Sequence, residues 1–76
     1  MNAERLETLI LDAHERGDSE NLARYYFQAA QIKDHEGNAE AAGFLLTQAY
    51  VFALESGLTL ADEIRAELVC RGREEP

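Results

Sequence analysis

The sequence of this 76-residue chain predicts an all-α fold of four antiparallel helices. Three observations support this fold class. Apolar residues recur three and four positions apart over most of the chain, which is the spacing of one face of an α-helix. Gly17, Gly37, Gly57 and Gly72 each follow such a segment, and glycine readily adopts the left-handed conformation that ends a helix. The first three of these glycines are 20 residues apart, which is the length of a helix plus a tight turn.

The first helix is predicted over residues 2–16, with Asn2 as its N-cap. One face carries apolar residues at helical spacing, namely Leu6, Leu9, Ile10 and Ala13. The other side carries four acids that we call the acidic face: Glu4, Glu7, Asp12 and Glu15. Leu11 lies among these acids, well away from the apolar face. A single exposed leucine is ordinary in a soluble protein.

The second helix is predicted over residues 19–36, where the turn Gly17-Asp18-Ser19 offers side chains that can cap it. Its central apolar stripe consists of Leu22, Tyr26, Ala29 and Ala30. Further apolar residues widen this stripe on both edges: Ala23, Tyr25, Phe27 and Ile32. An apolar arc of this width predicts contact with more than one neighbouring helix.

The third helix is predicted over residues 39–56, and the 14 residues from 41 to 54 carry no charge. Its core face consists of Ala42, Leu45, Leu46, Ala49 and Ala53. Phe44 and Val51 project almost opposite that face, with Thr47 and Leu54 beside them. A helix that is apolar nearly all round is expected to be buried on both sides. Either the fourth helix or a partner protein is therefore expected to cover the outer residues.

The fourth helix is predicted over residues 59–71, with Thr59 and Asp62 forming a capping box. Its buried face is expected to contain Leu60, Ala61, Ile64 and Leu68. We expect residues 1–72 to form a single helical domain, because a chain of this length has no room for a second core. The tail at residues 73–76 is expected to be disordered.

Residues 23–56 resemble one tetratricopeptide repeat, a helix-turn-helix unit of 34 residues. The packing positions that carry the resemblance are Tyr26, Ala29 and Ala30 before the turn at Gly37, and Ala42, Leu46 and Ala49 after it. The chain departs from the family pattern at Lys33, where an aromatic residue is usual, and at Leu54, where a proline is common. The resemblance implies a tetratricopeptide-like fold that binds proteins, with dimerisation as one way to complete it. A plain four-helix bundle is the alternative.

Composition restricts the compartment and the partners. The formal net charge of −8 repels nucleic-acid phosphates and anionic lipid headgroups, so neither nucleic acid nor a membrane is an expected partner. No apolar run approaches the roughly 20 residues that span a bilayer. The single Cys70 cannot form an internal disulfide, and no signal peptide is apparent, so a cytoplasmic location is expected. A core of this size rarely yields more than roughly 3–5 kcal/mol of stability, which self-association would increase.

The sequence contains no motif for catalysis, a cofactor or a metal ion. His14 and His35 each precede a glutamate, but neighbours on a helix point about 100° apart and do not form a ligand pair. Both are expected to be solvated residues near helix C-termini. Cys70 is expected to be inert, since a helix C-terminus raises the pKa of a thiol. We therefore expect neither an enzyme nor a cofactor.

Two functions remain. The first is a small adaptor or regulatory domain that binds a protein partner or itself, a homodimer included. Its expected contact residues are Phe44, Thr47, Val51, Leu54 and Leu11. The alternative is an acidic inhibitor whose carboxylates replace phosphates on a nucleic-acid-binding protein. High salt would weaken charge mimicry sharply and leave an apolar contact intact.

Overall fold

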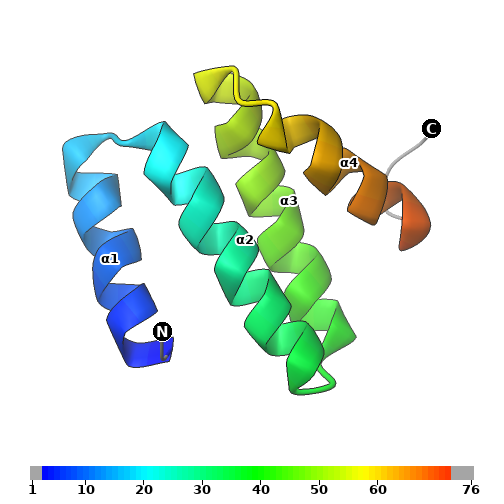
Figure 1. Cartoon of the computed structure of the whole chain (residues 1–76). Helices are drawn as coiled ribbons and strands as arrows, with labels where there is room; N and C mark the ends of the chain where they lie inside the picture. The colour runs from blue at the N-terminus through cyan, green and yellow to red at the C-terminus, as the bar shows by residue number, and fades with distance from the viewer. Residues whose placement is uncertain (1–2, 73–76) are drawn as a thin grey trace.

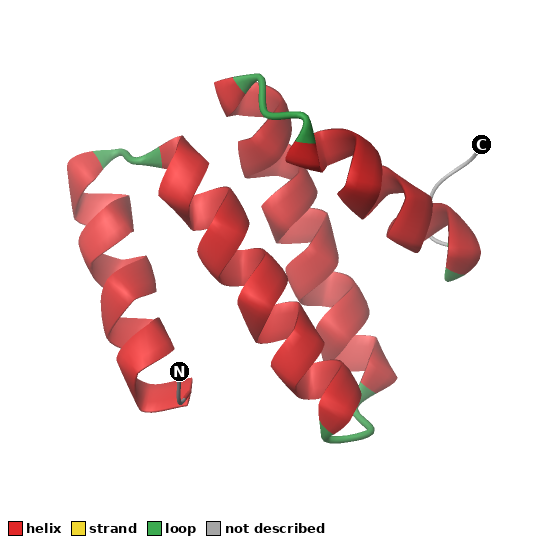
Figure 2. Ribbon diagram, viewed as in Figure 1, coloured by secondary structure: helices red, strands yellow, loops and turns green. Residues whose placement is uncertain are grey.

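Four α-helices make up residues 3–72, the part of the chain that this computed structural model describes (Figure 1). They are α1 (Ala3–Arg16), α2 (Ser19–His35), α3 (Ala39–Ser56) and α4 (Leu60–Cys70). Residues 3–72 contain no strand (Figure 2), so the predicted all-α class is confirmed. Every predicted helix boundary lies within one residue of the observed one. The expected N-cap Asn2 and the tail at residues 73–76 lie outside the described residues.

Glycine ends each helix in the way that the sequence predicts. The four glycines after the helices have positive φ values, between 64° and 81°. At Gly37, the glycine N–H donates to the carbonyl of Asp34 (3.0 Å) and the next N–H, of Asn38, donates to the carbonyl of Lys33 (2.9 Å). These two bonds form a Schellman motif, which satisfies carbonyls that the helix leaves without partners. The chain reverses direction at this turn (Figure 1).

Side-chain caps start α2 and α3, but not α4. Asp18 Oδ1 accepts a hydrogen bond from the Asn21 N–H, and Asn38 Oδ1 accepts one from the Ala41 N–H, both at 3.2 Å. The predicted capping box at Thr59 is wrong, because the Thr59 side chain makes no cap hydrogen bond. Thr59 has helical backbone angles (φ −63°, ψ −21°), and its carbonyl accepts the Asp62 N–H at 3.0 Å. A backbone turn therefore satisfies the amide that a capping side chain would have reached.

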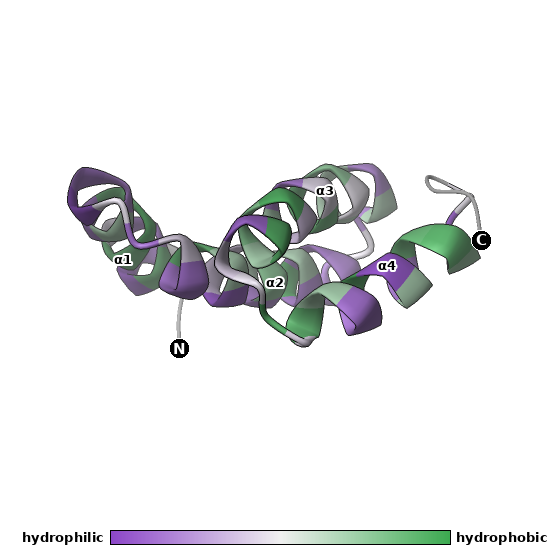
Figure 3. Ribbon diagram, turned by 90° about the horizontal axis from the view of Figure 1, so that it is seen from above, coloured by the Kyte–Doolittle hydropathy of each residue, from purple (hydrophilic) through white to green (hydrophobic). Residues whose placement is uncertain are grey.

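The helices pack mainly against their neighbours in sequence: α1 against α2, α2 against α3, and α3 against α4. The contact between α2 and α3 is the most extensive of the three. The Cα atoms extend over 32 × 29 × 14 Å, so the described part of the chain is a thin slab. Figure 3 shows its four helices spread across the slab.

Small residues form much of the core between α2, α3 and α4. Ala23, Ala49 and Ala53 are fully buried, and such side chains let helix backbones approach closely. The larger apolar residues of this core are Leu46, Ile64 and Leu68, all at most 2% exposed. Burying a Leu or Ile side chain contributes about 1.5–3 kcal/mol. None of the helices between residues 3 and 72 has the length and apolar character of a membrane-spanning segment.

Candidate interaction surface

The outer face of α3 presents Phe44, Thr47, Val51 and Leu54, which we call the α3 stripe. Phe44 is 59% exposed, Val51 48% and Leu54 57%, and Thr47 is exposed as well. Their positions differ by three and four residues, so they lie along one side of the helix. The opposite side faces the core with Ala42, Leu46, Ala49 and Ala53, which are at most 2% exposed. The α3 stripe is thus the solvent-facing half of a helix that is apolar on both sides.

Helix α4 packs against the core side of α3 and leaves the α3 stripe open. Its buried residues Ala61, Ile64 and Leu68 belong to the same apolar cluster as Leu46 and Ala49. The four residues of the α3 stripe do not belong to that cluster. Of the two coverings that the sequence allows, the structure therefore rules out the fourth helix. Burial of the α3 stripe requires something outside residues 3–72.

The α3 stripe is electrically neutral and its polar group is already satisfied. Thr47 donates its hydroxyl hydrogen to the Gly43 carbonyl of the preceding turn, at 3.1 Å. Covering Thr47 with apolar atoms therefore leaves no hydroxyl donor without an acceptor. The nearest charges along the helix are Glu40 and Glu55, both exposed, at the two ends of the α3 stripe. The surface can therefore be dehydrated without burying a charge.

The acidic face of α1 is exposed as expected, since Glu4, Glu7, Asp12 and Glu15 all face solvent. The charge of Asp12 is compensated, because Asp12 Oδ2 accepts a hydrogen bond from Arg16 Nε at 2.9 Å. This bond is the main cause of the raised pKa of Arg16. The acidic face therefore presents less net negative charge to a phosphate-binding partner than its sequence indicates.

Leu11 does not join the α3 stripe. It is 66% exposed on α1, and α2 lies between α1 and α3 (Figure 1). The structure therefore brings four of the five expected contact residues together on one helix and places the fifth elsewhere.

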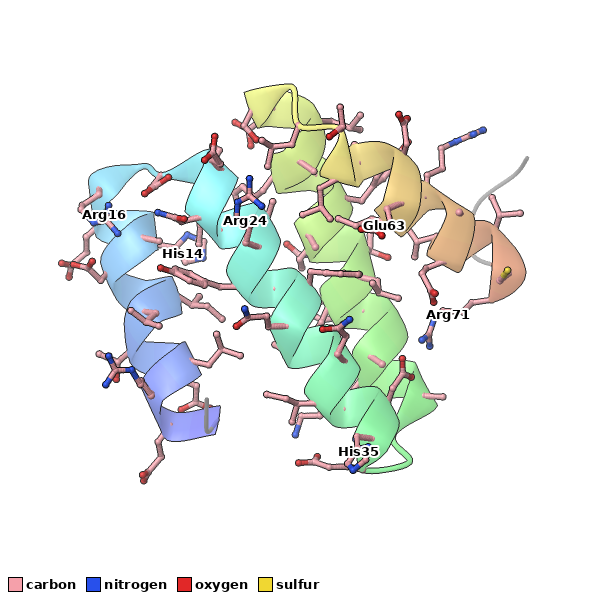
Figure 4. All side chains as sticks on the ribbon, viewed as in Figure 1. His14, Arg16, Arg24, His35, Glu63 and Arg71 are labelled. Atoms are coloured by element: carbon pink, nitrogen blue, oxygen red, sulfur yellow. The ribbon has the colours of Figure 1, made fainter. Side chains whose placement is uncertain are left out.

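An aromatic cluster that the sequence does not reveal joins α1 to α2 and α3. His14 Nε2 and the Tyr26 hydroxyl form a hydrogen bond of 2.9 Å, and His14 lies between α1 and α2 (Figure 4). The Tyr26 and Phe52 rings are stacked, with centroids 5.7 Å apart, and the His14 ring meets both edge-on. His14 is exposed, as expected, and it also packs and forms a hydrogen bond. His14 and Tyr26 are 12 positions apart, and no local sequence pattern indicates this contact.

A second long-range contact holds the end of α4. Arg71 Nη2 forms an ion pair with Asp34 of α2, and Arg71 Nε lies 3.7 Å from the Glu67 carboxylate. Arg71 points from the end of α4 toward the α2–α3 pair (Figure 4). The sequence indicates only its favourable position at a helix C-terminus. The pairing with Asp34 connects residues 37 positions apart and follows from the tertiary fold.

Two grooves flank these contacts. One, of about 290 Å³, is apolar and lies between α1 and α2, with Leu6, Ile10, Tyr26 and Ile32 in its lining. The other, of about 420 Å³, holds Arg71 and Asp34 together with His35 and Glu67. No three His, Cys, Asp or Glu side chains between residues 3 and 72 are grouped so that they could hold a metal ion. Cys70 is a free, exposed thiol.

Comparisons of this chain with protein-family models, with curated proteins and with solved structures gave no significant match.

Proposed function

We propose that this chain is a small cytoplasmic interaction domain without catalytic activity, which binds another protein chain through the α3 stripe. The observation that carries the proposal is the exposure of Phe44, Val51 and Leu54 on one uncharged helix face. Contiguous apolar side chains of this size on a soluble protein mark interaction surfaces. Large apolar anchors that become desolvated supply most of the affinity at such surfaces. The free thiol of Cys70 suits a reducing compartment.

The proposed scaffold for this surface is a tetratricopeptide-like pair formed by α2 and α3. Supporting it, four of the six residues expected at its packing positions are at most 2% exposed, namely Ala30, Ala42, Leu46 and Ala49. The other two, Tyr26 and Ala29, are half-buried. The contacts between consecutive helices, in a thin slab, also resemble the stacking of helical repeats more than a closed bundle. Repeat proteins of this kind use their exposed helix faces to bind other proteins.

The test compares tagged wild-type protein with Phe44→Glu in pull-downs from the native cell, washed at low and high salt. We expect a partner that wild type retains at high salt and that Phe44→Glu loses, because the substitution places a carboxylate in an apolar contact. Leu11→Glu is the matched control, since it adds the same charge at an exposed residue of another helix. Identical retained proteins for wild type and Phe44→Glu would overturn the proposal. A basic partner lost only at high salt would indicate charge mimicry instead.

The Phe44→Glu variant must also fold. Phe44 is 59% exposed, and substitutions at such sites usually change stability by less than about 0.5 kcal/mol. We therefore expect unchanged helicity in far-ultraviolet circular dichroism. Loss of helicity would show that Phe44 belongs to the core and not to an interface.

A further inference from the structure

The outer face of α3 has the residue spacing of a seam between two helices. Glu40, Phe44, Thr47, Val51 and Leu54 follow one another at intervals of four, three, four and three residues. This alternation is the heptad pattern by which one helix packs along another. A matching helix needs apolar side chains at the same spacing and no charge between them. The exposed side of α3 itself meets both requirements, since residues 41–54 are uncharged.

We propose that the α3 stripe is covered by the α3 stripe of a second copy of this chain, in an antiparallel pair with a two-fold axis. This rests on the proposed function and names its partner. If the two-fold axis passes through the middle of the α3 stripe, Phe44 lies beside Leu54 of the second copy and Thr47 lies beside Val51 of the second copy. Large side chains then meet at both ends and smaller ones in the middle. Each copy contributes the same surface, as a two-fold interface requires.

The composition of the α3 stripe favours a second copy over a basic partner. A partner selected by charge would need carboxylates within the contact, and the α3 stripe has none between Glu40 and Glu55. The Thr47 hydroxyl is already bonded to Gly43, so an identical apolar surface can cover it without supplying a hydrogen-bond acceptor. Two copies of the α3 stripe can therefore meet without burying a charge or an unbonded hydroxyl donor.

The available area makes this a weak, reversible dimer. A standard interface buries about 800 Å² on each partner. The described chain has 4872 Å² of accessible surface, so such an interface would take about a sixth of it. The α3 stripe has four residues, whereas a standard interface has about 20–30 on each partner. The net charge of −8 on each copy also opposes association. We therefore expect a dissociation constant in the micromolar range or weaker, which falls as salt screens the repulsion.

The ends of the α3 stripe provide a test of orientation. In the antiparallel pair, Glu40 of one copy lies close to Glu55 of the second copy. Glu40→Lys would replace this repulsion with attraction and tighten the dimer. In a parallel pair, the two substituted side chains would face each other and repel. Glu15→Lys is the matched control, because it changes the net charge equally at an exposed residue of α1.

The experiment is sedimentation equilibrium of the purified full chain, from about 10 µM to about 1 mM, at low and high salt. We expect wild type and Leu11→Glu to dimerise reversibly, and more tightly at high salt. Phe44→Glu and Val51→Glu should weaken the dimer at least about tenfold, with unchanged helicity. Glu40→Lys should dimerise more tightly than Glu15→Lys.

A wild-type monomer throughout this range would overturn the inference, and so would a dimer that Phe44→Glu and Val51→Glu leave intact. Tighter association of Glu15→Lys than of Glu40→Lys would overturn the antiparallel pairing. If the chain is a monomer but still captures a partner that Phe44→Glu loses in the pull-down, the proposed dimer is refuted and the proposed function stands. A monomer with no such partner refutes both.

Discussion

Asp18 shows how one side chain can hold a turn together. Its carboxylate accepts the Asn21 backbone N–H at 3.2 Å and the Asn21 side-chain amide at 2.7 Å, and Arg16 Nη1 also donates to it at 2.9 Å. The backbone hydrogen bond from Asn21 is the main cause of the lowered pKa of Asp18, followed by the side-chain bond from Asn21. The charged form of Asp18 is therefore bound more strongly in the folded chain than in the unfolded one.

This lowered pKa predicts a defined dependence of stability on pH. Because the folded pKa of Asp18 lies below the unfolded one, its stabilising contribution is complete above the usual aspartate pKa of about 3.9. That contribution is lost as the pH falls through the folded pKa. Asp18→Asn keeps an N-cap but cannot titrate, so its melting temperature should fall less steeply in acid than that of wild type. The melting temperatures of both proteins can be measured by circular dichroism at a series of pH values from neutral to acidic. An equal fall in melting temperature for wild type and Asp18→Asn would contradict the prediction.

At the scale of the helix, the contact between α2 and α3 depends on small residues as much as on large ones. Ala23, Ala42, Ala49 and Ala53 are all 0% exposed. In a close-packed interior, added methyl groups push neighbours out of their preferred rotamers. The alanine positions therefore set the distance between the two helices, and the larger Leu46 fills the space that remains.

Enlarging one of these alanines should destabilise the fold. We expect Ala49→Leu to lower the free energy of unfolding by about 1–3 kcal/mol, because the added atoms find no free space. Ala66→Leu on the exposed side of α4 makes the same chemical change and should stay within about 0.5 kcal/mol of wild type. Urea unfolding followed by circular dichroism compares the two variants. If Ala49→Leu left the free energy of unfolding unchanged, α2 and α3 could move apart at little cost in free energy.

For the whole molecule, charge opposes folding. Residues 3–72 carry thirteen acidic side chains and six basic ones, and their Cα atoms extend over only 14 Å in the thinnest direction, so like charges lie closer together than in the unfolded chain. The observed ion pairs, such as Arg24 with Glu20, are largely exposed and contribute little individually. Repulsion among the carboxylates should therefore be the dominant electrostatic effect on stability.

Salt should accordingly stabilise the chain. We expect the melting temperature of the Phe44→Glu variant, in which the proposed dimer is weakened, to rise between about 20 and 300 mM NaCl as the repulsion is screened. The same variant with Glu7→Gln and Glu15→Gln added should show a smaller rise, because two of the repelling charges are gone. A melting temperature that falls with salt would mean that ion pairs such as Arg71 with Asp34 outweigh the repulsion.

The sequence by itself determined the helices and their ends. The signals that do so act within one turn of a helix, as when Asp18 caps Asn21 or when Gly37 bonds back to Asp34. Apolar spacing also predicted which side of each helix is buried, including Ile64 and Leu68 on α4. The error at Thr59 arose where a backbone turn competed with a side-chain cap for the same amide.

Only the tertiary structure decided which surfaces meet. Helix α3 is apolar on two sides, and nothing local shows that α4 takes the side of Leu46 and leaves Phe44 exposed. The ion pair of Arg71 with Asp34 likewise joins residues that are distant in sequence. Local hydrogen bonds and periodicity shape each helix, whereas the choice between two similar apolar faces depends on how all the helices can pack at once. For that reason the sequence predicted the residues of the α3 stripe, but only the folded chain showed that α4 leaves them exposed.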